Sequence, residues 1–262
     1  MRDINIKLFV GLSLLLVIIR LLFISNTLLI NDEAYYAIYA RHLAWGYVDH
    51  GPIVAYLIKL FTLIWENSFT VRLGATTLMS VLTIILYYFG KKYFNTETGI
   101  VLSLSLTANM LFHTNSIVIT PDVPMTFFTI LAMMFYYLAY CVNKKYIYIG
   151  GGMLGLAVLS KISALFPAIG IALYPILIKE KRHWLKNIHY YGSFSLAFLI
   201  FLPFIIWNFQ NDFAFVRNQG SHIYRGGGFG HFINLWLGSV SYTHLRAHET
   251  DSYLVCRLLL EK

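Results

Sequence analysis

The chain has 262 residues, of which 58% are hydrophobic and only 12% are charged. Soluble domains carry about 25% charged residues, so this composition excludes a water-soluble globule, and the apolar content excludes a disordered chain. The two cysteines, Cys141 and Cys256, are too few to form a disulfide framework. We therefore predict an all-α polytopic membrane protein.

Apolar stretches recur along the chain, and most approach the roughly 20 residues that a helix needs to cross a bilayer. We expect seven spans, of which the fifth and sixth are short. The first is too long for the apolar region of a signal peptide, and no small-residue cleavage site follows it. The spans are Ile6–Ser25, Thr70–Gly90, Gly99–Ser116, Pro124–Val142, Tyr146–Ser160, Ser163–Ile178 and Tyr190–Trp207.

Basic residues between the spans indicate the orientation. They gather in one set of loops, which the positive-inside rule assigns to the cytoplasm of a multi-pass cell membrane protein. This placement accounts for the net charge of +8 without a nucleic-acid partner. The basic residues are Arg2, Lys7, Lys91, Lys92, Lys144, Lys145, Lys179, Lys181, Arg182 and Lys186, against Asp3, Glu97 and Glu180.

The opposite loops hold most of the remaining acids, so we expect the functional site there, on the periplasmic or extracellular face of a bacterial membrane. The long loop Asn26–Phe69 contains two segments, Glu33–Trp45 and Pro52–Trp65, that we predict to be helices lying at the membrane interface. The acids on this side are Asp32, Glu33, Asp49, Glu66, Asp122 and Asp212.

The chain changes character near Ser241. The segment before it, Phe232–Val240, resembles an eighth span cut short, and residues 241–262 resemble a peptide translated from a sequencing-library adapter. We therefore expect residues 1–240 to be the N-terminal part of a transmembrane domain and residues 241–262 to be a non-native tail. The alternative is a genuine short C-terminal helix.

Three positions on the outer side carry candidate acids. Asp32 and Glu33 stand at a predicted helix start, where they either stabilise the helix dipole or place a base near a hydroxyl acceptor. Asp49 and His50 lie in a Gly-Pro turn, for which an ordinary surface turn is the alternative. Asp122 lies between two prolines and is either the N-cap of a span or a functional acid, two roles that are compatible.

Lys161 separates the two short spans on the outer side, against the positive-inside bias. A lysine is costly in lipid unless it reaches the interface or an anion, and a lipid phosphate is a natural partner. Arg217 and Arg225 are weaker candidates for the same role. The sequence contains no phosphate-binding loop, dinucleotide fingerprint, zinc-ligand spacing or nucleophile elbow.

Five motifs in order carry a resemblance to a known family. They are Asp-Glu-Ala-Tyr-Tyr, Leu-Ala-Trp-Gly-Tyr-Val-Asp-His-Gly-Pro, Thr-Pro-Asp-Val-Pro, Gly-Leu-Ala-Val-Leu-Ser-Lys-Ile-Ser and Leu-Pro-Phe-Ile-Ile-Trp-Asn. Together they resemble GT-C glycosyltransferases of family 39 type, such as protein O-mannosyltransferases, the lipid A aminoarabinose transferase and rhizobial lipopolysaccharide-core transferases. The resemblance implies a GT-C transmembrane helix bundle that moves a sugar from a polyprenyl-phosphate carrier to a glycan, lipid or protein acceptor.

The resemblance also implies roles for individual residues. Asp32 occupies the position of the family's first-loop catalytic acid, and Asp122 matches its second aspartate. Asp49 and His50 occupy the position where an acid and a base help to form a metal or donor-phosphate site. Here His50 and Gly51 replace the lysine and proline of the aminoarabinose branch, which argues against transfer of that sugar.

The chemistry of such a transfer needs a base for the acceptor and positive charge for the departing phosphate. We expect Asp32 to be the base and Lys161, with His50 or Arg217, to bind the donor phosphate. No cofactor is required by this scheme, although a divalent metal held by Glu33 and Asp49 is left open.

Two other functions compete with this one. A non-enzymatic flippase or transporter of a lipid-linked sugar is the first, but it should place its polar residues near the bilayer midplane. Arg20 is the main such residue here, and it lies toward the outer end of its span. A purely structural membrane subunit is the second, and it leaves the acids Asp32, Asp49 and Asp122 unexplained.

Overall fold

The computed structural model describes residues 2–225, so the expected tail and the start of an eighth span lie outside the described part. The chain divides into two units, Met1–Asp212 and Phe213–Lys262. Within residues 2–225 every regular element is a helix, as the composition predicted. The first unit contains α1 (Arg2–Asn26), α2 (Asn31–Arg41), α3 (Ile53–Phe61), α4 (Ser68–Tyr93), α5 (Thr96–Ala108), α6 (Met110–Thr114), α7 (Asp122–Cys141), α8 (Tyr146–Ser160), η1 (Ile162–Ala164), α9 (Leu165–Leu177), η2 (Lys179–Lys186) and α10 (Ile188–Gln210), and the second contains α11 (Ala214–Arg225).

Four described helices are long and apolar enough to cross a membrane: α4, α7, α10 and the Lys7–Asn26 part of α1. Each coincides with an expected span. The apolar side chains of α1 are largely exposed, as in a helix that faces lipid. The chain is therefore an all-α, multi-pass membrane protein.

The expected uninterrupted span over Gly99–Ser116 is wrong. The structure divides this segment into α5 and α6, because Asn109 adopts an extended conformation between them. The Asn109 side chain accepts hydrogen bonds from the backbone N–H groups of Leu111 and Phe112, which caps the start of α6. A single polar residue thus ends one helix and begins the next.

The two short expected spans differ in how well the structure matches them. Helix α8 has the predicted bounds but only 15 residues. The segment Ser163–Ile178 begins as the 3-10 turn η1, continues as α9, and then bends by 106° into η2. Counting this bent pair as one span gives up to five candidate spans among the described residues.

Small residues allow α8 and α10 to approach closely. Gly151 and Gly155 lie on one face of α8, and they contact Ser193 and Ala197, which have the same spacing on α10. A Cβ atom at Gly151 would lie 2.3 Å from the carbonyl oxygen of Ser193, so no larger residue fits. Paired small residues of this kind are typical of helix packing in membranes.

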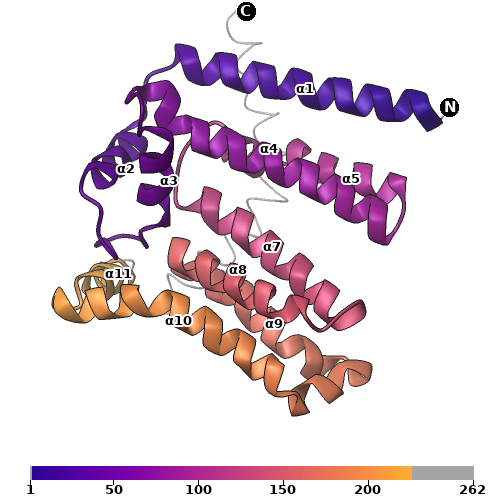
Figure 1. Ribbon diagram of the computed structural model, residues 1–262. Coiled ribbons are helices and arrows are strands. Elements are labelled where there is room, and N and C mark those ends of the chain that lie inside the picture. Colours follow the sequence, from indigo (N-terminus) through magenta and orange to yellow (C-terminus); the bar gives the residue numbers. More distant parts are fainter. Residues whose placement is uncertain (1, 226–262) are drawn as a thin grey trace, which may run out of the picture. The chain divides into compact units, whose positions relative to one another are not determined.

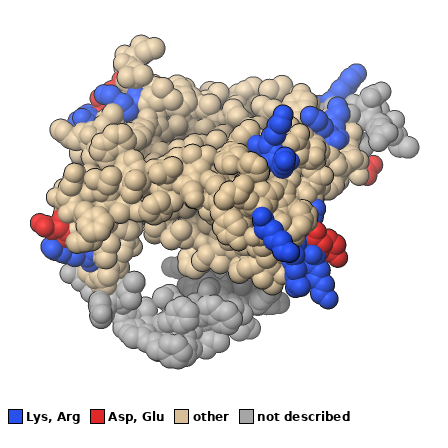
Figure 2. All heavy atoms as spheres, turned by 60° about the horizontal axis from the view of Figure 1, so that its bottom comes forward, with Lys and Arg blue, Asp and Glu red and all other residues tan. Residues whose placement is uncertain are grey.

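The two interfacial helices are confirmed as helices, although shorter than predicted. In Figure 1, α2 and α3 lie at the end of the first unit where α4 and α7 begin. Figure 2 shows charged side chains toward the two sides of the view, with mainly uncharged surface between them. This distribution is the one expected of a helix bundle in a bilayer.

Candidate functional site

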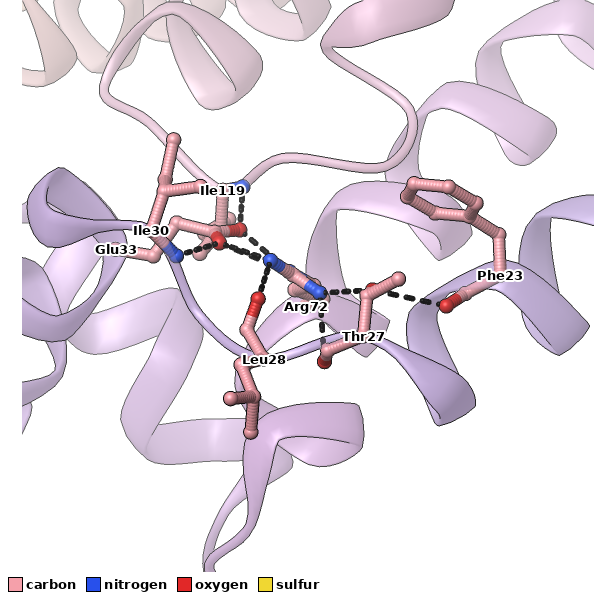
Figure 3. A network of polar contacts seen from close by, with 7 residues as sticks. All are labelled: Phe23, Thr27, Leu28, Ile30, Glu33, Arg72 and Ile119. Carbon is pink, nitrogen blue, oxygen red and sulfur yellow. Dashed lines mark hydrogen bonds and ion pairs between the residues drawn. The ribbon is translucent and has the colours of Figure 1, made fainter.

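A buried ion pair anchors the start of α2. Glu33 is 0% exposed and Arg72, near the start of α4, is 2% exposed. The Arg72 Nε atom donates to both Glu33 carboxylate oxygens at 2.8 and 2.9 Å, and its Nη2 donates to Oε2 at 2.5 Å. Figure 3 shows that the other guanidinium hydrogen bonds go to the residues just after α1. Nη1 donates to the carbonyl and hydroxyl oxygens of Thr27, and Nη2 donates to the carbonyl oxygen of Leu28.

Backbone donors complete this network around Glu33. The N–H of Ile30 donates to Oε2 and the N–H of Ile119 donates to Oε1, each at 3.0 Å. Glu33 therefore caps the start of α2, in agreement with the structural one of the two roles that the sequence allows for the Asp32–Glu33 pair. Because a guanidinium and two amides occupy its oxygens, Glu33 does not fit a metal ligand. Within residues 2–225, no three His, Cys, Asp or Glu side chains are grouped to hold a metal ion.

Asp32 is left outside this network. It lies in the first turn of α2 and is exposed, whereas its neighbour Glu33 is buried. Its carboxylate makes no hydrogen bond or ion pair with the part of the chain that the structure describes. One turn further along α2 lies Tyr36, on which the charge of Asp32 acts. The position leaves Asp32 open to water and to an incoming group.

Asp49 is held by two tyrosines of α2. The Tyr35 hydroxyl donates to Asp49 Oδ2 at 2.5 Å, the Tyr39 hydroxyl donates to the same oxygen at 3.2 Å, and the two hydroxyls also contact each other. Burial is the largest cause of a raised pKa for both tyrosines, and Asp49 adds to it. Both phenols therefore keep their protons at neutral pH and fix the turn that carries Asp49.

Tyr36 and His50 lie between the acids, with ring centroids 6.0 Å apart. Burial, followed by the charges of Asp32, Asp49 and Asp122, raises the pKa of Tyr36 to about 12. Burial and then the nearby charge of Lys161 lower the pKa of His50, against the opposing effect of the two aspartates that face it. His50 is therefore neutral near pH 7, where an ordinary histidine is already mostly neutral.

Lys161 binds Asp122. Its Nζ atom lies 2.8 Å from each oxygen of the Asp122 carboxylate, which joins the residue after α8 to the first turn of α7. The side chains are 28% and 37% exposed, so the pair is open to the surroundings. Lys161 thus lies at the same end of the first unit as the acids, as the sequence predicted.

The turn that carries Asp49 and His50 packs directly against the end of α8. Gly51 is buried there, and a Cβ atom on it would lie only 1.7 Å from the carbonyl oxygen of Leu159. Pro52, which follows, is fully buried. Backbone contact at Gly51 therefore positions His50 relative to Lys161, two residues beyond Leu159.

The structure brings together most of the predicted site residues that belong to the first unit. Arg217 lies on α11 in the second unit, and Glu33 is engaged by Arg72. Sequence reasoning overlooked Arg72, although a single arginine within a predicted span was a signal for it. It also overlooked the contact of Tyr35 and Tyr39 with Asp49, which no sequence pattern indicates. The residues that gather at one end of the first unit are Asp32, Asp49, His50, Asp122 and Lys161.

Comparison with known proteins identifies the family. The family model described as dolichyl-phosphate-mannose-protein mannosyltransferase matches residues 49–207. The matched region begins at Asp49 and contains Asp122 and Lys161, whereas Asp32 precedes it. No curated protein and no solved structure shows a significant match to the chain. The family match covers more than half of the chain, which therefore belongs to the dolichyl-phosphate-mannose-protein mannosyltransferase family of GT-C membrane glycosyltransferases.

Proposed function

We propose that the chain transfers a sugar from a polyprenyl-phosphate carrier to a hydroxyl group of a glycan, lipid or protein acceptor. The reaction takes place at the end of the first unit that holds α2 and α3, on the periplasmic or extracellular face. One observation carries this proposal: Asp49 and His50, Asp122, and Lys161 come from three separate segments and converge at that end. A structural subunit has no need of such a convergence.

The transfer is a single displacement at the anomeric carbon of the sugar. The acceptor oxygen forms a bond to this carbon while its proton passes to the Asp32 carboxylate. The bond between the anomeric carbon and the phosphate oxygen breaks, and polyprenyl phosphate leaves with the electron pair. Attack from the opposite face inverts the anomeric centre, by analogy with inverting glycosidases.

Lys161 stabilises the charge that develops on the departing phosphate. Its ammonium group has three donors, and Asp122 holds it through the carboxylate, so a donor is left for a phosphate oxygen. Neutral His50 donates a hydrogen bond to the phosphate instead of supplying charge.

Asp49 has a positioning role in this scheme. Tyr35 and Tyr39 fix its carboxylate, and Asp49 in turn fixes the loop that presents His50. This role requires no metal ion.

A transfer assay in detergent separates a transferase from a flippase. The purified full-length protein is incubated in micelles with a polyprenyl-phosphate sugar that is radiolabelled in the sugar, together with an acceptor extract of the source membrane. A transferase moves the label to the acceptor without a bilayer. A flippase only carries lipids between leaflets, so recovery of all label in the donor would contradict the proposal.

A further inference from the structure

A cleft lies between α1 and α4, away from the proposed transfer site. It has a volume of about 330 Å³ and is lined mainly by apolar side chains of α1 and α4, with Leu104 and Thr107 from α5. Along α1 it extends from Phe9 to Arg20. At 1.5 Å per residue, this separation corresponds to roughly 16 Å. The cleft is therefore long and mainly apolar, with a cation at one end.

Arg20 is incompletely paired at that end. It is 2% exposed, and its Nη2 lies 3.3 Å from Nδ1 of His113. Its Nε is buried without a hydrogen-bond partner, as is the Oγ atom of Ser80, which also lines the cleft. No carboxylate in residues 2–225 forms an ion pair with Arg20. Arg72, the other buried arginine of residues 2–225, has Glu33 as its counter-ion.

An arginine inside a span is costly without a counter-ion, because its guanidinium stays protonated. His113 offers only a neutral acceptor nitrogen to Arg20, so no group of residues 2–225 compensates the positive charge. The missing partner must supply negative charge at Arg20 and apolar surface along the cleft toward Phe9. A soluble anion supplies only the first of these, and a neutral lipid only the second.

We propose that this cleft binds an anionic phospholipid. The phosphate group lies at Arg20, and one acyl chain follows α1 toward Phe9 and Tyr87, whose rings stack at the other end of the cleft with centroids 5.3 Å apart. The lipid comes from the leaflet at the end of the bundle that carries Asp32, because Arg20 lies six residues before the end of α1 at that side. This site does not depend on the proposed transfer activity.

The test measures lipid binding to the purified full-length protein by native mass spectrometry, with titrations of phosphatidylglycerol and phosphatidylcholine of the same chain length. We expect the wild type to prefer phosphatidylglycerol. In Arg20→Gln, loss of a charge-assisted contact raises the Kd for phosphatidylglycerol by about 10–150-fold and removes the preference. Arg20→Lys, which keeps the charge, retains part of the preference.

Two further variants distinguish the site from a general effect of charge. Ser13→Phe places a ring in the cleft without altering Arg20, and we expect it to weaken binding of phosphatidylglycerol. Arg41→Gln removes an exposed arginine outside the cleft and should bind as the wild type does. Equal binding of the two lipids by the wild type, or wild-type binding by Ser13→Phe, would overturn the proposal. If Arg20→Gln does not fold, Ser13→Phe decides the question.

Discussion

Glu33 and Arg72 lie 39 residues apart in the sequence and form an ion pair whose side chains are 0% and 3% exposed. The pair joins the start of α2 to the start of α4, and it also collects backbone groups from the end of α1 and from the segment before α7. It thereby fixes the first turn of α2 and turns the adjacent Asp32 outward. Of the two adjacent carboxylates, Glu33 is therefore structural, whereas Asp32 is exposed.

Breaking this ion pair should destabilise the protein strongly. Removing one partner of a buried pair leaves an uncompensated charge, which costs about 3–5 kcal/mol. We therefore expect Glu33→Gln and Arg72→Met each to lower the thermal unfolding temperature in detergent. The double variant should lose less stability than the two single variants lose together. Arg41→Gln, which breaks the exposed pair with Glu66, is the control and should cost at most about 1 kcal/mol. If Arg72→Met lowered the unfolding temperature as little as Arg41→Gln does, Arg72 would not have an anchoring role.

Gly51→Ala should separate the loop that carries His50 from the end of α8. The added methyl group would overlap the carbonyl oxygen of Leu159, and a backbone atom cannot move aside cheaply. We expect reduced sugar transfer together with a lower unfolding temperature. Gly152→Ala is the matched control, because its Cβ meets nothing within 4 Å and alanine favours a helix by roughly 1 kcal/mol over glycine. The prediction is checked by comparing transfer rates of the two variants per folded protein, and equal rates would contradict it.

His50 should make the protein sensitive to acid. Its pKa is lowered by burial and by Lys161, so the folded state holds the proton less tightly than the unfolded chain. Acidification below the usual pKa of about 6.5 then favours the unfolded state, whereas above that pH the histidine has no effect on stability. We expect the unfolding temperature of the wild type to fall more between pH 7.5 and 5.5 than that of His50→Gln. His42→Gln, at an exposed histidine of the same loop, is the control, and its unfolding temperature should fall as much over this pH range as that of the wild type. If the unfolding temperature of His50→Gln fell as much as that of the wild type, protonation of His50 would not be the cause of the acid sensitivity.

The pairing of Lys161 with Asp122 allows a charge-swap test. The pair is partly exposed, so its contribution to stability is about 0–1 kcal/mol. We expect Lys161→Met to lower donor efficiency by about 10–150-fold, the value of a charge-assisted phosphate contact. The double variant Asp122→Lys with Lys161→Asp keeps an ion pair but moves the cation to α7. If Lys161 binds phosphate, steady-state kinetics with varied donor should show that the double variant does not regain donor efficiency. If the double variant regained full donor efficiency, the pair would be only structural.

Much of the fold could be predicted from hydropathy, and less of the site. Long apolar runs gave α1, α4, α7 and α10, and even the bounds of the short helix α8 were predicted to the residue. The break at Asn109 was not predicted, because one polar residue hardly changes the mean hydropathy of a long apolar segment. A helix cap depends on local backbone geometry, about which mean hydropathy says nothing.

The site residues were identified singly, but their partners were not. Asp122 and Lys161 were both selected from the sequence, each as a group facing a ligand, yet they bind each other. Glu33 was placed beside Asp32 as a possible metal ligand, whereas its partner is Arg72. Pairings between distant residues depend on how helices pack, and the sequence pattern of one segment holds no information about the other.

The substitution Asp32→Asn tests the central claim most directly. It keeps the size of the side chain but removes the base, so we expect normal membrane insertion and unfolding temperature with turnover lower by about 10²–10⁴. Glu66→Gln is the matched control, because it neutralises another exposed acid of the same loop and should transfer sugar at the wild-type rate. The measurement is the rate of radiolabelled sugar transfer from the polyprenyl-phosphate donor by the full-length protein, per folded molecule. A loss of that size in Asp32→Asn alone is the result we predict, and near-normal transfer by Asp32→Asn would contradict the account.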